Sequence, residues 1–98
     1  MDLDNNKMYI HKNGTYINSG DPAAGSNGIT MTSSYSDFWT PWISKDDTNN
    51  NAKVYLNTGN PVIANDSGNA DDNGYGDFEY DVPAGFYALC TKNLATYG

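Results

Sequence analysis

The sequence has no arginine and only five basic residues, against twelve acidic ones, which gives a formal net charge of −7 at pH 7. Nucleic acids and anionic membrane surfaces are bound through clustered basic side chains, so neither is an expected partner of this chain. The absence of arginine also excludes bidentate clamps on phosphate groups. Hydrophobic runs are short as well, and none approaches the roughly 20 apolar residues of a membrane-spanning helix.

Histidine and cysteine each occur once, which limits the catalytic and metal chemistry open to the chain. A catalytic triad built on His11 needs an activated Ser or Cys and an orienting carboxylate, and no nucleophile-elbow motif is present. One His and one Cys do not make an ordinary zinc site. Cys90 has no partner for an intrachain disulfide, and its position in an apolar run predicts a buried structural thiol. We therefore expect a protein that is not an enzyme.

What the sequence does contain is typical of short strands joined by turns. Asn, Asp, Gly, Ser and Thr crowd the connections, while aromatic residues, eight of them Tyr, make up 13% of the 98 residues. Such a composition favours an all-β fold, and no helical periodicity of adequate length is visible. The length allows one domain at most, so residues 1–98 form a single β domain or the C-terminal portion of one.

The strongest local signal is a hairpin at Asn13-Gly14. Two β-prone runs, residues 7–11 and 15–17, flank this dipeptide. Asn-Gly suits a type I′ turn because both central residues of that turn require φ > 0. We therefore predict two antiparallel strands joined at this turn.

Further strands are expected along the chain. Alternation of apolar and polar residues predicts strands over 52–57 and 77–82, with Val54 and Leu56 facing inward. The apolar run 86–90 predicts a fully buried strand. Residues 29–33 form a shorter candidate strand, residues 58–76 are mostly loop, and residues 91–98 are an exit segment without helix. The run 86–90 is consistent with the inner sheet of an antiparallel β-sandwich.

A cluster of aromatic residues provides the candidate contact surface. Phe38, Trp39 and Trp42 cannot all point to one side of a regular strand, so at least one is expected to face outward. Tyr35, Trp39 and Trp42 are the residues we assign to this surface, as a sugar-stacking platform or an interface hot spot. The alternative is that alternate residues of the segment fill the core.

The acidic loops provide the candidate metal ligands. Asp71, Asp72 and Asp77 carry the oxygen ligands that Ca²⁺ prefers. Their segment lacks the Asp-x-Asp-x-Asp-Gly spacing and the closing Glu of an EF-hand. The alternative is a solvated turn, because Asp, Asn and Gly are the residues that turns require. No other cofactor is expected.

Four segments, in order, resemble the SPRY domains of bacteriophage proteins. Residues 2–22 contain K-M-Y-I-H-K-N-G followed by N-S-G-D-P, and Trp39-Thr40-Pro41 resembles the later F-T-P strand. Residues 54–61, V-Y-L-N-T-G-N-P, resemble the V-x-V-N-F-G-x-x-P strand. Residues 82–94, V-P-A-G-F-Y-A-L-C-T-K-N-L, resemble the closing P-x-G-F-x-A-L-x-T-x-N-L segment. Departures from the family pattern are Thr58, where the family has an aromatic residue, and the long insert at residues 60–76.

The resemblance implies a concanavalin-like or jelly-roll β-sandwich that binds or assembles and does not catalyse. Met1 falls where the family chain is already midway, so we expect the C-terminal half of such a domain, completed by another segment or chain. The implied setting is the surface of a phage particle, in a tail fibre, spike or decoration protein. Expected partners are other virion subunits, a second copy, or a host-surface glycan. Alternatives are a carbohydrate-binding module and a fragment of a polysaccharide-degrading enzyme that uses Glu79 with an Asp.

Overall fold

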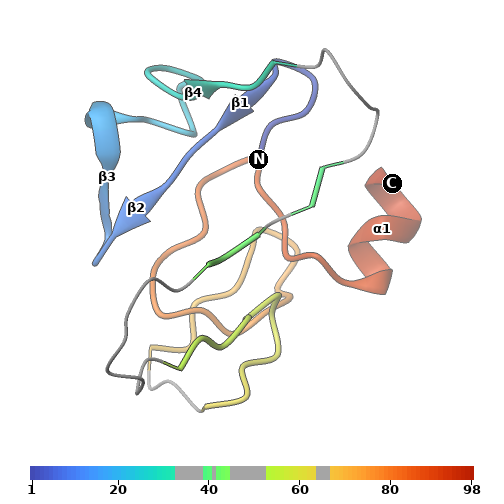
Figure 1. Cartoon of the computed structure of the whole chain (residues 1–98). Coiled ribbons are helices and arrows are strands. Elements are labelled where there is room, and N and C mark those ends of the chain that lie inside the picture. Colours follow the sequence, from blue (N-terminus) through green and yellow to red (C-terminus); the bar gives the residue numbers. More distant parts are fainter. Residues whose placement is uncertain (33–38, 41, 45–52, 64–66) are drawn as a thin grey trace.

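The computed structural model describes residues 1–32, 39–40, 42–44, 53–63 and 67–98 of the chain. It contains short elements joined by turns, bends and extended segments (Figure 1). In order these are β1 (Lys7–Met8), β2 (His11–Lys12), β3 (Thr15–Tyr16), the 3₁₀ turn η1 (Ile17–Ser19), β4 (Ile29–Thr30) and α1 (Thr91–Tyr97). The strands form two sheets, β1 with β4 and β2 with β3.

The hairpin at Asn13-Gly14 is confirmed. Strands β2 and β3 pair antiparallel, with His11 opposite Tyr16. Both turn residues have positive φ, 50° at Asn13 and 79° at Gly14, as a type I′ turn requires. The N–H of Ile17 donates to the carbonyl of Ile10 at 3.0 Å and extends the pairing by one step.

The expected first strand is divided between the two sheets. Strand β1 pairs antiparallel with β4, Lys7 opposite Thr30 and Met8 opposite Ile29, and the chain then passes into β2 (Figure 1). The Lys7 ammonium donates to the Thr30 hydroxyl at 2.8 Å and supports this pair. Strand β4 thereby confirms the start of the strand expected over residues 29–33, of which residue 33 lies outside the described part.

The expected β-sandwich is wrong. Within the described ranges every strand is two residues long, and the strands form two separate two-stranded sheets. Residues 53–57 form no strand, and residues 77–82 make a single bridge, between Phe78 and Asn69. Alternation predicts a strand only if a partner edge lies alongside, and the described residues supply none here.

The apolar run 86–90 also forms no strand, for a specific reason. The Ala88 N–H donates to a carboxylate oxygen of Asp71 at 2.9 Å, and its carbonyl accepts from the Asn93 side-chain amide at 2.8 Å. Both backbone groups that a sheet would use are thus taken by side chains. The expected full burial of the run is also wrong, because Ala88 is buried while Tyr87 and Leu89 are exposed. Cys90, expected to be buried, is half-buried.

Residues 91–97 form helix α1, which the sequence did not indicate. The helix has seven residues, and its backbone bonds run from Leu94 N–H to the Cys90 carbonyl and from Gly98 N–H to the Leu94 carbonyl, both 2.9 Å. Two turns are too short for a visible apolar period, and an isolated helix of this length is unstable in water. Tertiary contacts hold it. One is a parallel stack of Tyr97 on Tyr87 with ring centroids 4.4 Å apart.

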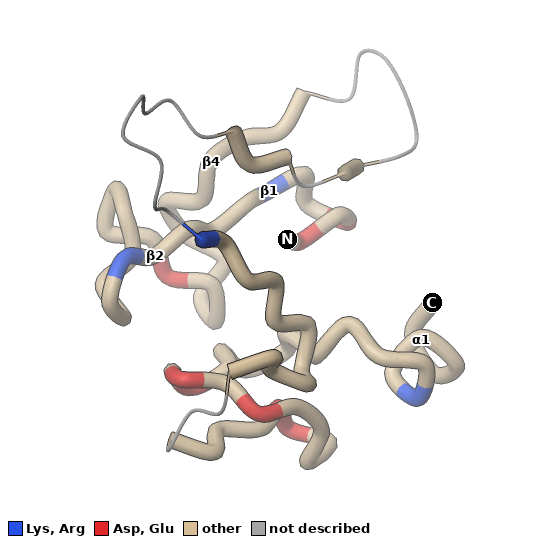
Figure 2. The backbone as a smooth tube through the Cα atoms, turned by 60° about the horizontal axis from the view of Figure 1, so that its bottom comes forward, with Lys and Arg blue, Asp and Glu red and all other residues tan. Residues whose placement is uncertain are grey.

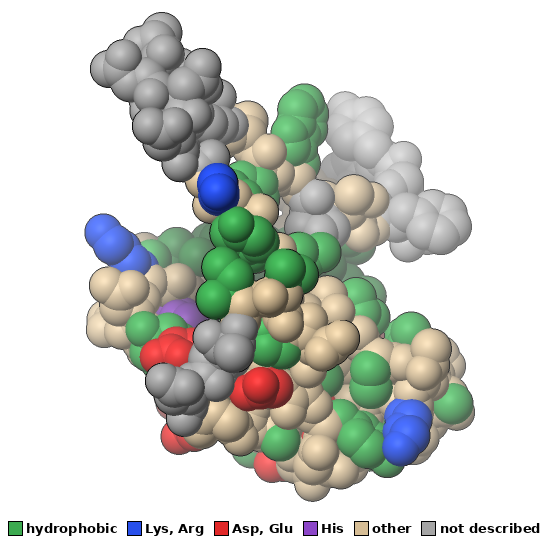
Figure 3. Space-filling model, turned by 90° about the horizontal axis from the view of Figure 1, so that it is seen from below, with side chains coloured by type: hydrophobic (Ala, Val, Ile, Leu, Met, Phe, Trp, Pro, Cys, Tyr) green, Lys and Arg blue, Asp and Glu red, His purple; other side chains and the backbone are tan. Residues whose placement is uncertain are grey.

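Little apolar side-chain surface is buried in the described part of the chain. Met31 and Ala88 are its buried hydrophobic residues, and none of its large side chains is fully buried. The radius of gyration is 14.8 Å, against about 13 Å for a compact domain of 100 residues. Figure 3 shows hydrophobic side chains gathered at the surface of one face. Val54 and Leu56, expected to face inward, are exposed.

Candidate functional site

The candidate site is a groove between the β2–β3 hairpin and residues 80–83. Its volume is about 820 Å³. One wall comes from the hairpin and the turn that follows it, and the other from the segment after Glu79. The side chains that matter for its chemistry are those of His11, Thr15, Tyr16, Asp21, Tyr80 and Asp81.

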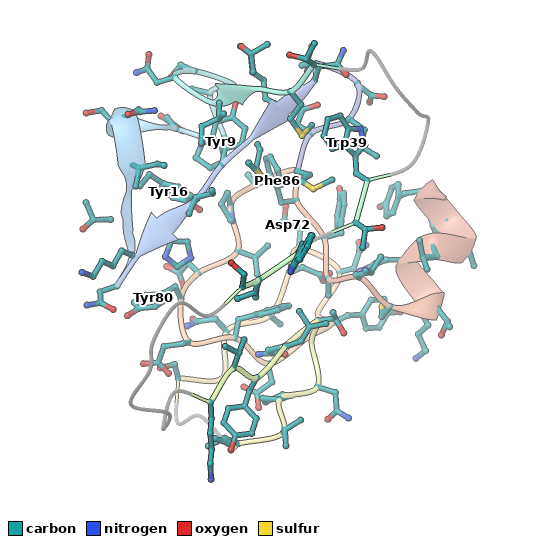
Figure 4. The ribbon with its side chains drawn as sticks, in the orientation of Figure 1. Tyr9, Tyr16, Trp39, Asp72, Tyr80 and Phe86 are labelled. Carbon is teal, nitrogen blue, oxygen red and sulfur yellow. The ribbon has the colours of Figure 1, made fainter. Side chains whose placement is uncertain are left out.

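Three aromatic rings form the centre of this groove. The His11 ring lies edge-to-face between two tyrosines, with centroid distances of 5.3 Å to Tyr16 and 5.1 Å to Tyr80. Strand pairing places His11 opposite Tyr16, while Tyr80 is brought in by the fold. Figure 4 shows Tyr16 and Tyr80 at the same edge of the molecule, well away from Trp39. Edge-to-face contacts of this kind fix the orientation of each ring.

Gly14 has a second role beside the turn. A Cβ built on it would lie 3.1 Å from two carbons of the Tyr80 ring, closer than most side-chain contacts. The Gly14 N–H also donates to Nδ1 of His11 at 3.2 Å. Because Nδ1 accepts this bond, the neutral imidazole carries its proton on Nε2. The hairpin turn therefore orients both His11 and Tyr80.

Acidic groups set the electrostatics of the groove. Partial burial, and then the negative charge of Asp21, raise the pKa of the Tyr16 hydroxyl above its usual value of 10.0. One oxygen of Asp21 accepts the Ala24 N–H at 3.0 Å and closes the turn of residues 21–24. Figure 2 shows acidic residues at the N-terminal end and along the C-terminal loops, with few lysines between them.

The Asp71 carboxylate accepts four hydrogen bonds within the protein. One oxygen accepts the backbone N–H groups of Asn73 at 3.0 Å and Tyr75 at 2.9 Å. The other accepts the Ala88 N–H at 2.9 Å and the Asn93 side-chain amide at 2.7 Å. Burial acts to raise the pKa of this carboxyl, but the four hydrogen bonds outweigh it and hold the pKa below the usual 3.8.

The three predicted calcium ligands are not brought into one set. Asp71 uses both oxygens on N–H donors, and one oxygen of Asp72 faces the Gly85 N–H at 3.4 Å. Asp77 contributes its backbone carbonyl to the Asn57 side-chain amide, at 2.8 Å. Among the residues that the structure describes, no three His, Cys, Asp or Glu side chains form a group that could hold a metal ion.

The predicted aromatic surface is described in part. Trp42 is 86% exposed and Trp39 is 41% exposed, while Tyr35 and Phe38 lie outside the described residues. Neither tryptophan lines the groove at the hairpin. Exposure leaves both rings available for contact, as a stacking platform or an interface hot spot requires.

A second exposed surface is the apolar segment, which we define as residues 53–63. Its large hydrophobic side chains are between 50% and 74% exposed, and these are Val54, Tyr55, Leu56, Val62 and Ile63. In the middle of the segment the backbone turns at Asn57, whose side-chain oxygen accepts the Gly59 N–H at 2.8 Å. The apolar side chains on either side of this turn thus face solvent.

The groove at the hairpin was missed by sequence reasoning. A cross-strand pairing of His11 with Tyr16 follows from the hairpin register and could have been found. The approach of Tyr80, 69 residues after His11 in the numbering, could not. Asp81 lines the groove beside it.

The chain was compared with known protein families, curated proteins and solved structures. No known family, curated protein or solved structure matches the chain. In the part of the chain that is described, no helix is long and apolar enough to cross a membrane.

Proposed function

We propose that the chain is a non-catalytic interaction module of a phage virion-associated protein, such as a tail fibre, spike or decoration protein. Two lines support the proposal. The four segments that resemble phage SPRY domains lie in the family's order between residues 2 and 94. The apolar segment offers an exposed surface for a partner. The proposal does not depend on a β-sandwich.

The observation that carries the proposal is the imbalance between buried and exposed apolar side chains. Five large hydrophobic side chains of the apolar segment are exposed, whereas the buried hydrophobic residues of the described chain are Met31 and Ala88. Covering one Val or Leu side chain stabilises an assembly by about 1.5–3 kcal/mol. Exposed apolar surface of this kind marks protein–protein contacts. Its partner would be another virion subunit or a second copy of the chain.

Backbone geometry supports the same surface. Residues 53–56 belong to no helix or strand, and no backbone hydrogen bond joins them to the described residues. Unpaired backbone N–H and C=O groups can pair with an added strand. An incoming strand would satisfy these groups and cover Val54 and Leu56 together.

Sedimentation of the full chain over a range of micromolar concentrations tests the proposal. We expect association that weakens in Leu56→Asp, because the substitution places a charge at the contact. Leu3→Asp is the matched control, since Leu3 is similarly exposed outside the apolar segment. A stable monomer at every concentration contradicts self-association, and pull-down with purified virion subunits then tests the remaining partner. Equal effects of the two variants would refute the role of the apolar segment.

Carbohydrate binding is a second candidate function. The exposure of Trp39 and Trp42 favours it, since stacking on a sugar requires an accessible ring. Tryptophan fluorescence during titration with host-surface glycan tests it, with Trp42→Ala as the variant expected to lose the response. A response that persists in Trp42→Ala would exclude this ring as the platform.

A further inference from the structure

We propose that the groove between the β2–β3 hairpin and residues 80–83 binds a neutral oligosaccharide. Tyr16 and Tyr80 would stack on the sugar rings, and Asp21 and Asp81 would accept hydrogen bonds from sugar hydroxyls. The inference deepens the proposed binding role and rests on it, but it places the sugar at residues other than Trp39 and Trp42.

The size of the groove fits such a ligand. Small-molecule sites occupy about 300–1,000 Å³, and this groove has about 820 Å³. A second hollow of about 280 Å³ shares the His11, Tyr16 and Tyr80 side chains with it. The tyrosines therefore lie where two hollows meet, so that a chain of sugar units could extend along both sides of them.

The aromatic rings are ordered before any ligand arrives. His11 contacts both tyrosine rings edge-to-face, and the absence of a Cβ on Gly14 leaves the space beside the turn to the Tyr80 ring. A tyrosine combines a flat apolar face with a polar hydroxyl, which matches the apolar face and hydroxyl rim of a sugar ring. Rings that are already fixed lose little conformational entropy on binding.

The groove offers both hydrogen-bond donors and hydrogen-bond acceptors, which a polyol ligand requires. Asp21 and Asp81 are acceptors, Nε2–H of His11 is a donor, and the Thr15 hydroxyl is both. Sugar hydroxyls also donate and accept, so each of these groups has a use. No lysine is among the described residues that line the groove, and the two carboxylates repel anionic sugars.

A cationic ligand is the competing occupant, since aromatic faces and carboxylates also attract ammonium groups. An ammonium group cannot accept a hydrogen bond from the His11 donor, and the groove is several times larger than such a group requires. These two features favour the neutral sugar. The experiment separates the two ligands directly.

The test titrates the ¹⁵N-labelled full chain with maltotriose, cellotriose and chitotriose, and separately with Nε-trimethyllysine. We expect saturable shifts of the His11 and Gly14 amides with at least one trisaccharide, at a Kd of about 1 mM or lower. Tyr80→Ala and Asp81→Asn should weaken that affinity about tenfold. Asp4→Asn is the matched control, since Asp4 is exposed outside the groove, and it should leave the affinity unchanged. Tyr80→Phe keeps the ring and should retain binding, which separates lost stacking from lost folding.

Several results would overturn the inference. These are no saturation by any of the three sugars at about 20 mM, binding that Tyr80→Ala and Asp81→Asn leave intact, or saturation by trimethyllysine alone. The Leu56→Asp variant keeps the two proposals apart. Sugar binding without association refutes self-association through the apolar segment, whereas association without sugar binding refutes the groove.

Discussion

Replacing Asn93 with alanine tests whether a buried polar network holds helix α1 against the loop of residues 69–78. The Asn93 side chain is 4% exposed. It donates to the Asp71 carboxylate at 2.7 Å and to the Ala88 carbonyl at 2.8 Å, and accepts from the Asn73 amide at 2.9 Å. The loop of residues 69–78 and the residue Ala88 thus both bind helix α1 through one side chain.

The magnitude follows from what the substitution leaves behind. An ordinary hydrogen bond contributes about 0.5–1.5 kcal/mol, and a buried group left without its partner costs about 1–3 kcal/mol. Asn93→Ala removes one of the two donors to the Ala88 carbonyl, which keeps the Cys90 N–H at 2.9 Å, and one of the four donors to the buried Asp71 carboxylate. We expect the free energy of unfolding to fall by about 2–4 kcal/mol, a large share of the 5–15 kcal/mol typical of a domain.

Urea denaturation followed by circular dichroism measures this loss, at one protein concentration because association also stabilises the folded chain. Asn60→Ala is the matched control, since Asn60 is exposed and should change stability by less than about 0.5 kcal/mol. Helix α1 should also lose protection from amide hydrogen exchange in Asn93→Ala. A loss no greater than that of Asn60→Ala, with unchanged exchange, would refute the network as the support of α1.

Two further predictions concern acid stability and close packing. The pKa of Asp71 is lowered, so the stability that its charge contributes is present above the usual 3.8 and is lost as the pH falls through that value toward the folded-state pKa. The urea midpoint of the native chain should therefore drop between pH 6 and about pH 3 more steeply than that of Asp71→Asn, and equal slopes would contradict the assignment. Gly28→Ala would place a Cβ 2.8 Å from a Tyr9 ring carbon and should cost about 1–3 kcal/mol by urea denaturation. Tyr9→Leu in the same background should recover part of that loss, and no recovery would exclude the ring as the cause.

The hairpin side of the candidate groove could be predicted from the sequence, whereas the side formed by Tyr80 and Asp81 could not. Pairing of His11 with Tyr16 follows from the Asn-Gly turn, because turn type fixes hairpin register. The arrival of Tyr80 and Asp81 depends on how the C-terminal loops return to the hairpin. Sequence reasoning instead favoured Tyr35, Trp39 and Trp42, of which the two described residues are exposed but lie outside this groove. The SPRY resemblance and the phage setting stay predictions.

What the sequence by itself determined was the local conformation. At Asn13-Gly14 two residues with positive φ specify a turn whatever surrounds them, and the hairpin formed as predicted. Tertiary structure decided the rest, because strand pairing and burial depend on partners far along the chain. Residues 86–90 have the composition of a buried strand, yet Asp71 and Asn93 take the hydrogen bonds of Ala88. Asp71 likewise lies in a segment whose composition is typical of a solvated turn. Its hydrogen bonds to Ala88 and Asn93, 17 and 22 residues away, bury its carboxylate and join the loop to helix α1.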